Sequence, residues 1–313
     1  MLMTNITTKP TVIAVGLLTL LNFDVPVQAA NYQTRVVVTG LMQPTGIVAG
    51  GNRTLYITQL PTPGVPGPQG GQNTVDLIRL GSGRVVNLTT GEPEPTNLAL
   101  DKRGHLYWTC KSAGVILERN RRGDVGLFLG GLAQPSGIDV DRWGQVYFTQ
   151  LPTPGVPGPL GGSNTVNVSN GMQTRVLTLG EPEPTDIAVS RHGTAYWTCK
   201  SAGVVLCRTP DGTVSLLLDG LDAPTGIALD DHRGRLYFTE VPTPGVDGSQ
   251  GGMNRVSVLD LRTDKLEIVN EGDPEPTDIT TAPNGSVFWT CTSAGVIVQA
   301  RDVREHCDWN AQD

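Results

Sequence analysis

Residues 40–47 read GLMQPTGI, and this octapeptide returns as GLAQPSGI at 131–138 and as GLDAPTGI at 220–227. The intervals between the leading glycines are 91 and 89 residues. Self-similarity at a nearly constant interval is the signature of an architecture built from repeated units. The sequence therefore predicts one structural unit of roughly 90 residues that is written three times.

Three further motifs recur at the same interval. They are QLPTPGVPG from residue 59, GEPEPT from residue 91 and WTCKSAG from residue 108, and each has two later copies. Every unit divides again into halves that contain short runs of β-branched and aromatic residues bounded by glycine or charged turns. A half of roughly 45 residues matches one four-stranded propeller blade. The sequence therefore predicts an all-β fold, a six-bladed β-propeller made of three double-blade repeats.

The two ends of the chain predict how the ring closes. Residues 34–41 (TRVVVTGL) match the fourth strands expected at 125–132 (VGLFLGGL) and 214–221 (VSLLLDGL). The last blade has a third strand from Val296 to Arg301 and then no clear fourth strand. We expect the N-terminal strand to complete that blade, because this pairing removes two free sheet edges at once.

The composition agrees with this architecture and excludes several classes of protein. The chain has 39 Gly and 23 Pro among 313 residues, which helix interiors tolerate poorly, so a long helical bundle is excluded. The net charge is −7 and no basic block occurs, which argues against a nucleic acid partner. The four His residues limit His-based catalysis and His metal sites. We expect a monomer.

The pattern PTGIALD, a glycine turn and LYFT, seen at 224–239, resembles the NHL-repeat, gluconolactonase-like and strictosidine-synthase-like superfamily of six-bladed propellers. The resemblance covers nearly all of the chain after its N-terminal segment and implies the fold. It implies much less about function, because these propellers include lactonases, ring-forming enzymes and binding scaffolds.

Residues 1–29 have the features of a secretory signal peptide. The apolar run TVIAVGLLTLLNF follows a short segment with one Lys, and small residues precede a cut near Ala29. The run is too short to span a bilayer, so we expect no membrane span. The expected parts are the signal peptide, a propeller over 30–301 and a tail over 302–313 of a secreted protein.

Four asparagines head glycosylation sequons, which would make the protein a glycoprotein in a eukaryotic host. They are Asn52, Asn87, Asn167 and Asn284.

Acidic and amide side chains are expected near the propeller axis in alternate blades. The inner strands of odd blades begin with PTG or PSG, whereas those of even blades carry Asn97, Asp186 and Asp278 at the glycine position. Three oxygen-bearing groups related by pseudo-threefold symmetry suit Ca²⁺ or Mg²⁺, and the resemblance also implies a divalent cation in the mouth of the funnel. Alternatively, each side chain bonds the backbone N–H groups of a neighbouring segment.

A second set of residues is expected at the rim of the face that carries the loops between blades and the loops between second and third strands. Three glutamates lie between stiffening prolines in the loops before the even blades, and two glutamines end second strands of odd blades. These candidate binding residues are Glu94, Glu183, Glu275, Gln59 and Gln150. The glutamates would complete a site or remain solvated rim charges.

The third copy departs from the internal symmetry. Glu240 stands where the other copies have Gln59 and Gln150, and Asp247 and Thr292 also differ from their counterparts. Since catalysis usually needs asymmetric roles, Glu240 is the best candidate for a general base or an additional cation ligand.

The cysteines leave two interpretations open. Cys110, Cys199 and Cys291 end equivalent second strands, so they are either small buried residues or a ring of thiolates for a soft metal. Cys207 and Cys307 have no counterparts in the repeats, and a disulfide between them would tie down the tail.

Two classes of function follow from these observations. The first is a secreted propeller that acts on a small organic molecule in the funnel, either as a lactonase-like hydrolase or as a ring-forming or isomerising catalyst. The second is a non-catalytic binding or scaffold propeller that recognises a protein or glycan through its proline-rich loops. The strong threefold similarity favours the second class, whereas Glu240 and the resemblance favour the first. Whether the protein is an enzyme stays open.

Overall fold

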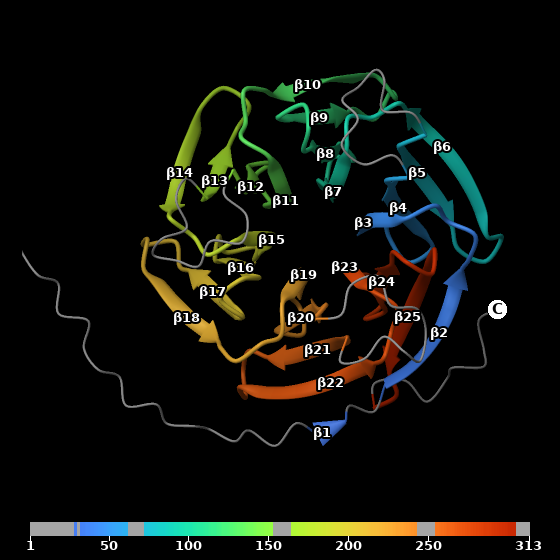
Figure 1. Ribbon diagram of the computed structural model, residues 1–313, viewed down its shortest axis with the longest axis vertical. Coiled ribbons are helices and arrows are strands. Elements are labelled where there is room, and N and C mark those ends of the chain that lie inside the picture. The colour runs from blue at the N-terminus through green and yellow to red at the C-terminus, as the bar shows by residue number, and fades with distance from the viewer. Residues whose placement is uncertain (1–27, 30–31, 62–71, 153–163, 243–253, 305–313) are drawn as a thin grey trace, which may run out of the picture.

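The computed structural model describes residues 28–29, 32–61, 72–152, 164–242 and 254–304. These residues form six antiparallel four-stranded sheets arranged as blades around a central axis, one of which carries a short additional strand (Figure 1). The described ranges contain strands and turns but no helix. They accordingly offer no helical segment with the length and hydrophobicity needed to cross a bilayer. The predicted six-bladed propeller is confirmed.

Each blade begins at the axis and ends at the rim, and we number the blades in chain order. Blade 1 consists of β3 (Pro44–Ala49), β4 (Thr54–Gln59), β5 (Thr74–Arg79) and β6 (Arg84–Thr90). Blade 2 consists of β7 (Pro95–Leu100), β8 (Leu106–Cys110), β9 (Val115–Arg119) and β10 (Val125–Leu129). Blade 3 consists of β11 (Pro135–Val140), β12 (Val146–Gln150), β13 (Thr165–Ser169) and β14 (Thr174–Leu179).

Blade 4 consists of β15 (Pro184–Val189), β16 (Ala195–Cys199), β17 (Val204–Arg208) and β18 (Val214–Leu218). Blade 5 consists of β19 (Pro224–Asp230), β20 (Arg235–Glu240), β21 (Arg255–Asp260) and β22 (Lys265–Glu271), and β1 (Gln28–Ala29) pairs in parallel with the edge of β22. Blade 6 consists of β23 (Pro276–Thr281), β24 (Val287–Cys291), β25 (Val296–Asp302) and, from the N-terminus, β2 (Tyr32–Val38).

The ring closes through the N-terminal strand, as the sequence predicts. Strand β2 pairs antiparallel with β25, in a register that runs from Tyr32 opposite Asp302 to Val38 opposite Ile297. Val38 and Leu41 are buried in a core cluster that joins blade 6 to blade 1. Blade 6 therefore combines β2, from the N-terminal part of the chain, with β23, β24 and β25, and this pairing closes the ring.

A buried threonine ties the second strand of each blade to its inner strand. The pairing of every inner strand shifts register between its proline and the residue three positions later. The N–H of the residue between them donates instead to a threonine Oγ1 at 2.7–3.2 Å. These fully buried threonines are Thr58, Thr109, Thr149, Thr198, Thr239 and Thr290. The polar backbone next to the axis is thus satisfied without a continuous ladder.

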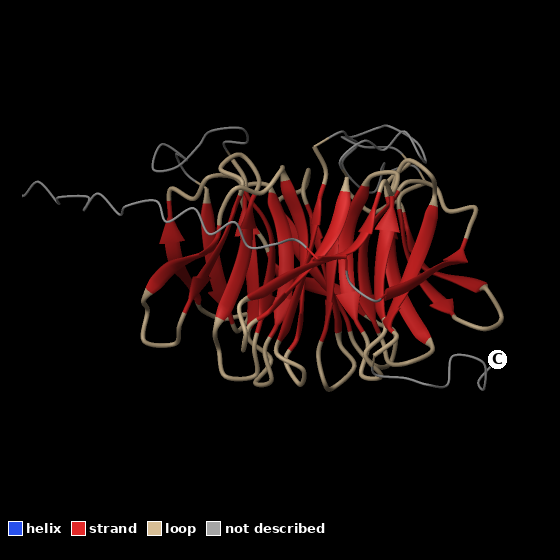
Figure 2. Ribbon diagram, turned by 90° about the horizontal axis from the view of Figure 1, so that it is seen from below, coloured by secondary structure: helices blue, strands red, loops and turns tan. Residues whose placement is uncertain are grey.

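The propeller has two faces, which Figure 2 shows in side view as the two rims of loops and turns. We call the face at which the inner strands begin the entry face, and the face at which they end the exit face. The hydrophobic core is divided into six clusters that lie mostly between adjacent blades. This arrangement leaves the inner strands free to present polar side chains to the axis.

Candidate functional site

A cavity of 180 Å³ lies on the propeller axis and is lined by the inner strands of all six blades. Its lining runs from the third residue of the inner strands to their last residues, so the cavity lies in the half of the channel nearer the exit face. Its polar lining residues are the threonines Thr280 and Thr281 and four acidic or amide residues, Asn97, Asp139, Asp186 and Asp278. The structure therefore brings together the three axial residues that the sequence singles out, together with one that it does not.

Asp186 links three blades through its two carboxylate oxygens. Oδ1 accepts hydrogen bonds from the N–H of Ile187 at 2.8 Å and from Nδ2 of Asn97 at 2.7 Å. Oδ2 accepts from the N–H of Ile227, in the next blade, at 2.8 Å. Asn97 completes the link by accepting from the N–H of Leu98 at 2.6 Å. Asn97, the equivalent residue in the first repeat, therefore donates a hydrogen bond to Asp186 of the second repeat. An aspartate at position 97 would instead repel the carboxylate of Asp186.

Asp278 has the same role at the seam of the ring. Its Oδ1 accepts from the N–H of Ile279 at 2.8 Å, and its Oδ2 accepts from the N–H of Ile47 at 2.7 Å. Ile47 lies in blade 1, so this carboxylate connects the last blade to the first. The alternative interpretation of the axial residues, that they bond neighbouring backbone N–H groups, describes these contacts.

Asp139 lies on β11, two residues further along its inner strand than the axial trio. Its Oδ1 accepts from the N–H of Val140 at 2.7 Å and its Oδ2 from the N–H of Val189, in blade 4, at 2.6 Å. The equivalent residues in blades 1 and 5 are Val48 and Ala228, so the carboxylate occurs in one copy of the repeat alone. Asp139 is half-buried, whereas Asp186 and Asp278 are each 5 % exposed. Asp139 is thus the axial acid most open to the cavity.

The axial carboxyl groups hold protons more tightly than ordinary aspartates. Burial raises the pKa of Asp139 to about 7, although hydrogen bonds from the backbone of Val189 and Val140 partly oppose the rise. Burial also raises the pKa of Asp186, and the charge of Asp278 raises it further. Burial raises the pKa of Asp278 itself. A cluster of carboxyl groups with raised pKa values around one cavity is a candidate functional site.

Asp139 is the residue that sequence reasoning missed. The signal was present as a departure from symmetry, because the inner-strand motifs GIV at 46–48 and GIA at 226–228 correspond to GID at 137–139. Glu240 and Asp247, which also depart from the symmetry, lie in the third copy near the proline-rich loops, whereas Asp139 lies in the second copy on an inner strand. Its importance depends on the cavity that the six strands enclose.

The axial donor set does not fit a bound divalent cation. Each oxygen of Asp139, Asp186 and Asp278 accepts a hydrogen bond from a backbone N–H. Within the described ranges, no group of three His, Cys, Asp or Glu side chains is placed to hold a metal ion. A cation would have to displace several of these bonds, so we derive no chemistry from a metal at this site.

The raised pKa values predict how stability depends on pH. The folded protein retains axial protons that an unfolded aspartate loses near pH ~4, so their contribution is complete below that pH and is lost as the pH rises through about 7. We expect the melting temperature to fall by several degrees between about pH 5 and pH 8. Differential scanning calorimetry of the wild type and of Asp139→Asn tests this, because the variant should show a shallower slope. Equal slopes in both proteins would contradict the assignment to Asp139.

Glu240, the sequence candidate for a general base, forms a buried ion pair. It is 1 % exposed, and its Oε2 accepts from Nε of Arg255 at 2.6 Å while its Oε1 accepts from Nη2 at 3.0 Å. Oε1 also accepts from the N–H of Asp222 at 2.8 Å. The pair raises the pKa of Arg255 through the hydrogen bond to Glu240. These contacts support a structural role, and none of them supports proton transfer to a substrate.

Gln59 and Gln150 occupy the positions equivalent to Glu240 and make equivalent contacts. Their Oε1 atoms accept from the N–H of Met42 at 2.6 Å and of Ala133 at 2.7 Å, which fixes the loop that leads into each odd blade. Gln59 Nε2 also donates to Asp76 Oδ2 at 2.6 Å. Thus the change to Glu240 in the third copy accompanies Arg255, where the other copies have Thr74 and Thr165.

The three rim glutamates lie in the loops of the entry face with an unusual backbone. Glu94, Glu183 and Glu275 have φ angles of 57°, 58° and 55°, in the left-handed region, and each precedes the proline that starts an inner strand. Their carbonyl oxygens accept from the N–H groups of Lys111, Lys200 and Thr292. All three side chains are half-buried. A binding role for them stays a prediction.

The cysteines of the repeats belong to a buried contact that the sequence did not reveal. The Nε1 groups of Trp108, Trp197 and Trp289 donate to Glu92, Glu181 and Asp273 at 2.7–3.0 Å. Cys110 and Cys199 lie beside the same carboxylates, with Sγ 3.9 Å from the glutamate oxygen. Burial raises the pKa of each thiol in the ring. No three Cys, His, Asp or Glu side chains of the described residues are placed to hold a metal ion, so the structure supports the interpretation of small buried residues.

The remaining cysteines do not add a site. Cys207 lies 3.1 Å from the hydroxyl of Ser215, and Cys307 lies outside the described residues, so the predicted disulfide is not tested.

The histidines of the propeller lie away from the axial cavity. His105, His192 and His232 lie in turns of the exit face, and His105 is hydrogen-bonded to Glu118.

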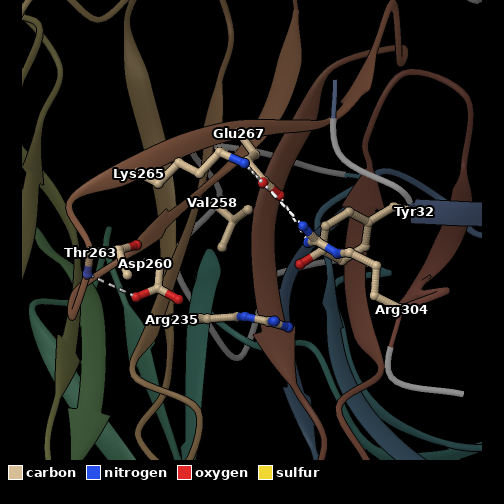
Figure 3. Close-up of a pocket in the computed structure, with 8 residues that line it drawn as sticks. All are labelled: Tyr32, Arg235, Val258, Asp260, Thr263, Lys265, Glu267 and Arg304. Atoms are coloured by element: carbon tan, nitrogen blue, oxygen red, sulfur yellow. Dashed lines mark hydrogen bonds and ion pairs between the residues drawn. The ribbon is translucent and has the colours of Figure 1, made fainter. Parts of the chain in front are cut away.

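A second pocket lies where blade 5 meets the closing strand, and Figure 3 shows its lining. The guanidinium of Arg304 donates to Glu267 through Nη1 at 3.1 Å and Nη2 at 2.9 Å, and Lys265 Nζ lies 2.7 Å from the same carboxylate. Arg304 also binds Asp302. The pocket measures 120 Å³ and its charged groups are largely paired with one another. We interpret it as an ionic clasp that holds blade 6 to blade 5.

Comparison with known proteins gives matches among solved structures alone, since no protein-family model and no curated protein matches the chain. A streptogramin B lyase superposes with a TM-score of 0.60 at 17 % identity, over 87 % of this chain and 98 % of that one. A gluconolactonase from Xanthomonas campestris gives 0.66 at 17 %, over 88 % and 91 % of the two chains. The calcium-binding protein regucalcin from Agrobacterium tumefaciens gives 0.64 at 12 %, over 87 % and 95 %.

The chain shares the propeller fold of these structures. The similarity extends over most of both chains in each comparison, which agrees with the resemblance that the repeat motifs carry. By their descriptions, two of these neighbours are a lyase and a gluconolactonase, and the third is a calcium-binding protein. At such low identity the comparisons establish the architecture, and the chemistry has to be argued from the residues of this chain.

Proposed function

We propose that the protein is a secreted propeller that acts on a small organic molecule, by hydrolase-like or lyase-like acid–base chemistry at the axial cavity. The observation that carries the proposal is the convergence of three acidic side chains with raised pKa values on one cavity. Hydrolases and lyases share this fold, which supports the proposal without identifying a substrate.

Asp139 is the proposed acid–base residue. Its pKa of about 7 lets it exchange a proton at neutral pH, and general acid–base catalysis is most efficient when the pKa lies near the working pH. Asp186 is a second acidic group at the same cavity, with a pKa that burial and the charge of Asp278 raise.

The cavity limits what the site can take. Its 180 Å³ is smaller than the ~300 Å³ of a pocket for a drug-sized ligand, but it accommodates one functional group and several water molecules. We therefore propose a substrate that places a small polar group, such as a lactone ring or an ester group, next to Asp139.

A panel of small lactones and esters, assayed for hydrolysis and for elimination across a range of pH, tests this function. We expect turnover with an inflection near neutral pH, and a loss of at least about 100-fold in Asp139→Asn. Asp124→Asn changes the same charge in an exposed turn and should retain activity. If the wild type turns over no compound in the panel, the enzyme proposal fails.

The second candidate is a binding or scaffold propeller for a protein or glycan. The axial oxygens accept backbone hydrogen bonds in a nearly threefold arrangement, which is what a structural role requires. The proline-rich loops that would grip such a partner lie largely outside the described residues. Failure of the activity assay, together with capture of a specific partner by the intact protein, would favour this candidate.

The divalent cation expected from the sequence provides a separate test. Because the carboxylate oxygens are occupied by backbone donors, we expect Ca²⁺ and a chelator to give the same melting temperature at neutral pH. A site saturated at ~100 times its dissociation constant would instead stabilise the fold by roughly 2.7 kcal/mol. If Ca²⁺ raises the melting temperature and Asp186→Asn abolishes the rise, the result would show that a cation does bind at the axis.

Secretion is part of the proposal because residues 1–29 have the charge, length and cleavage features of a signal peptide. Cleavage after Ala29 would remove β1, which adds two residues to the edge of blade 5, and would leave β2 intact. Sequencing the N-terminus of the exported protein should give Ala30 as the first residue, and a retained segment 1–29 would argue against it.

A further inference from the structure

Four turns of the exit face, two in blade 2 and two in blade 3, are built in the same way. The side chain of an Asp or Asn at the start of each turn accepts a hydrogen bond from the N–H group two residues later, at 2.8–3.0 Å. This contact fixes the backbone of the turn and leaves the side chain of the second residue at its tip. The tip residues are Arg103, Arg122, Trp143 and Met172.

The tips combine exposed apolar side chains with exposed cations. Trp143 is 54 % exposed and Met172 is 95 % exposed, whereas the other tryptophans of the described residues are fully buried. The guanidinium of Arg142 lies 4.2 Å from the centre of the Trp143 ring. The exposed cations of these turns are Lys102, Arg103, Arg121, Arg122 and Arg142.

The four turns form one continuous patch, which we call the tip patch, on the rim of short turns opposite the entry face (Figure 2). A Cβ at Gly104 would lie 3.3 Å from Cγ of Arg121, so the inner and outer turns of blade 2 are in contact. A Cβ at Gly171 would lie 3.1 Å from the ring of Phe128 on β10, so the outer turn of blade 3 packs on the rim strand of blade 2. The cations and the apolar tips therefore belong to the same surface.

The tip patch has a net positive charge. Asp101 and Asp141 are buried and bond the backbone of their own turns, and the exposed Asp124 accepts from Asn120 Nδ2 at 3.0 Å. Among the residues that the structure describes, none of the five cations of the patch forms an ion pair.

The exit face of the following blades is different, because its arginines are paired with acids. The pairs are Arg191 with Asp231, Arg233 with Asp230 and Arg262 with Asp260. A cationic surface that also carries exposed apolar tips is therefore a property of blades 2 and 3.

We propose that the tip patch docks the propeller on a lipid bilayer that carries anionic headgroups. Cations next to such a surface are attracted to it, and apolar side chains between them gain by entering the boundary of headgroups and acyl chains. Tryptophan in particular favours the headgroup level, where its ring is partly apolar and partly polar. A soluble polyanion would match the cations but would leave Trp143 and Met172 in water, so the bilayer is the favoured partner. The proposal does not depend on the activity proposed for the axial cavity.

Cosedimentation with vesicles tests the proposal. The chain should begin at Ala30, because the apolar run at 11–23 would bind lipid by itself. One set of vesicles contains equal parts of phosphatidylcholine and phosphatidylglycerol, and the other contains phosphatidylcholine alone. The protein should sediment with the anionic vesicles and much less with the neutral ones, and added salt should weaken the binding.

Two matched double variants locate the surface. Arg121→Gln with Arg122→Gln removes two exposed cations from the tip patch and should weaken binding to anionic vesicles by about tenfold or more. Lys111→Gln with Lys200→Gln removes the same charge from half-buried positions at the entry face and should leave binding unchanged. No sedimentation of the wild type with anionic vesicles, or an equal loss in both double variants, would overturn the proposal.

Tryptophan fluorescence separates insertion into a bilayer from simple attraction between charges. Anionic vesicles should shift the emission of the wild type to shorter wavelength, whereas Trp143→Phe should bind but lose that part of the shift, because Trp143 is the exposed tryptophan of the patch. Dextran sulfate is the soluble polyanion for comparison. If the protein binds dextran sulfate and vesicles without a shift that depends on Trp143, the patch recognises polyanions in general and the bilayer proposal is wrong.

Discussion

A chain that begins at Met42, without residues 30–41, should lose the cooperative unfolding of the whole propeller. The deletion removes β2, exposes the full edge of β25 and takes Val38 and Leu41 out of the core cluster that joins blades 6 and 1. Burial of each such side chain is worth roughly 1.5–3 kcal/mol, and the strand's backbone hydrogen bonds add to this. Because typical domains are stable by only about 5–15 kcal/mol, we expect the truncated protein to melt at least about 10 °C lower or to remain unfolded.

A chain that begins at Tyr32 is the matched control. It lacks the N-terminal segment and β1 but retains β2, so it should melt like the chain that begins at Ala30. A synthetic peptide of residues 30–41 added to the truncated chain should restore part of the lost stability by occupying the edge of β25. An unchanged melting temperature after removal of residues 30–41, measured by near-ultraviolet circular dichroism, would rule out closure through β2.

Gly137→Ala should destabilise the propeller by about 3 kcal/mol or more, at the upper end of the range for overpacked cores. A Cβ at Gly137 would lie 2.4 Å from the Cα of Asp186 and 2.8 Å from its Oδ1. The nearest of these atoms is backbone in the next blade, so it cannot rotate away as the end of a side chain can. The same alanine would push on the carboxylate that bonds Ile227 and Asn97.

Gly126→Ala provides the control for the change itself. Gly126 lies on the rim strand β10, where a Cβ would meet no atom within 4 Å. Its replacement should be neutral or slightly stabilising, because alanine restricts the unfolded chain more than glycine does. Chemical denaturation compares the stabilities of the two variants. Similar midpoints for both would show that the inner strands can move apart without loss of folding free energy.

The fold was predictable because its information is repeated along the chain. Three copies of the same motifs give the unit, its halves give the blades, and the match of residues 34–41 to the fourth strands gives the closure. The additional pairing of β1 with β22 was not predicted, because two residues carry no periodic signal. The sixfold threonine bonds were also hidden, since a single Thr in a strand reads as ordinary β-propensity.

The site was predictable in part, and the reason differs from residue to residue. Asn97, Asp186 and Asp278 were found because they replace glycine in a regular pattern, and the structure does bring them to the axis. The hydrogen bonds of Asp186 and Asp278 to the next blade, and that of Asn97 to Asp186, could not be read from spacing. Glu240 was selected as an asymmetric residue, but its asymmetry is shared with Arg255, which neutralises it. Sequence alone does not distinguish a charged residue that takes part in catalysis from one that is neutralised in an ion pair.

The alternation of glycine with Asn or Asp around the axis also constrains how blades could be added to this ring. A Cβ at Gly46, Gly137 or Gly226 would lie 2.4–2.8 Å from the Cα of Asn97, Asp186 or Asp278, so each glycine is required by the blade that follows it. Two acid-bearing blades in succession would collide at this level. Inserting a second Asp- or Asn-bearing blade beside an existing one would therefore disrupt the ring, whereas duplication of the whole double-blade unit would preserve the alternation.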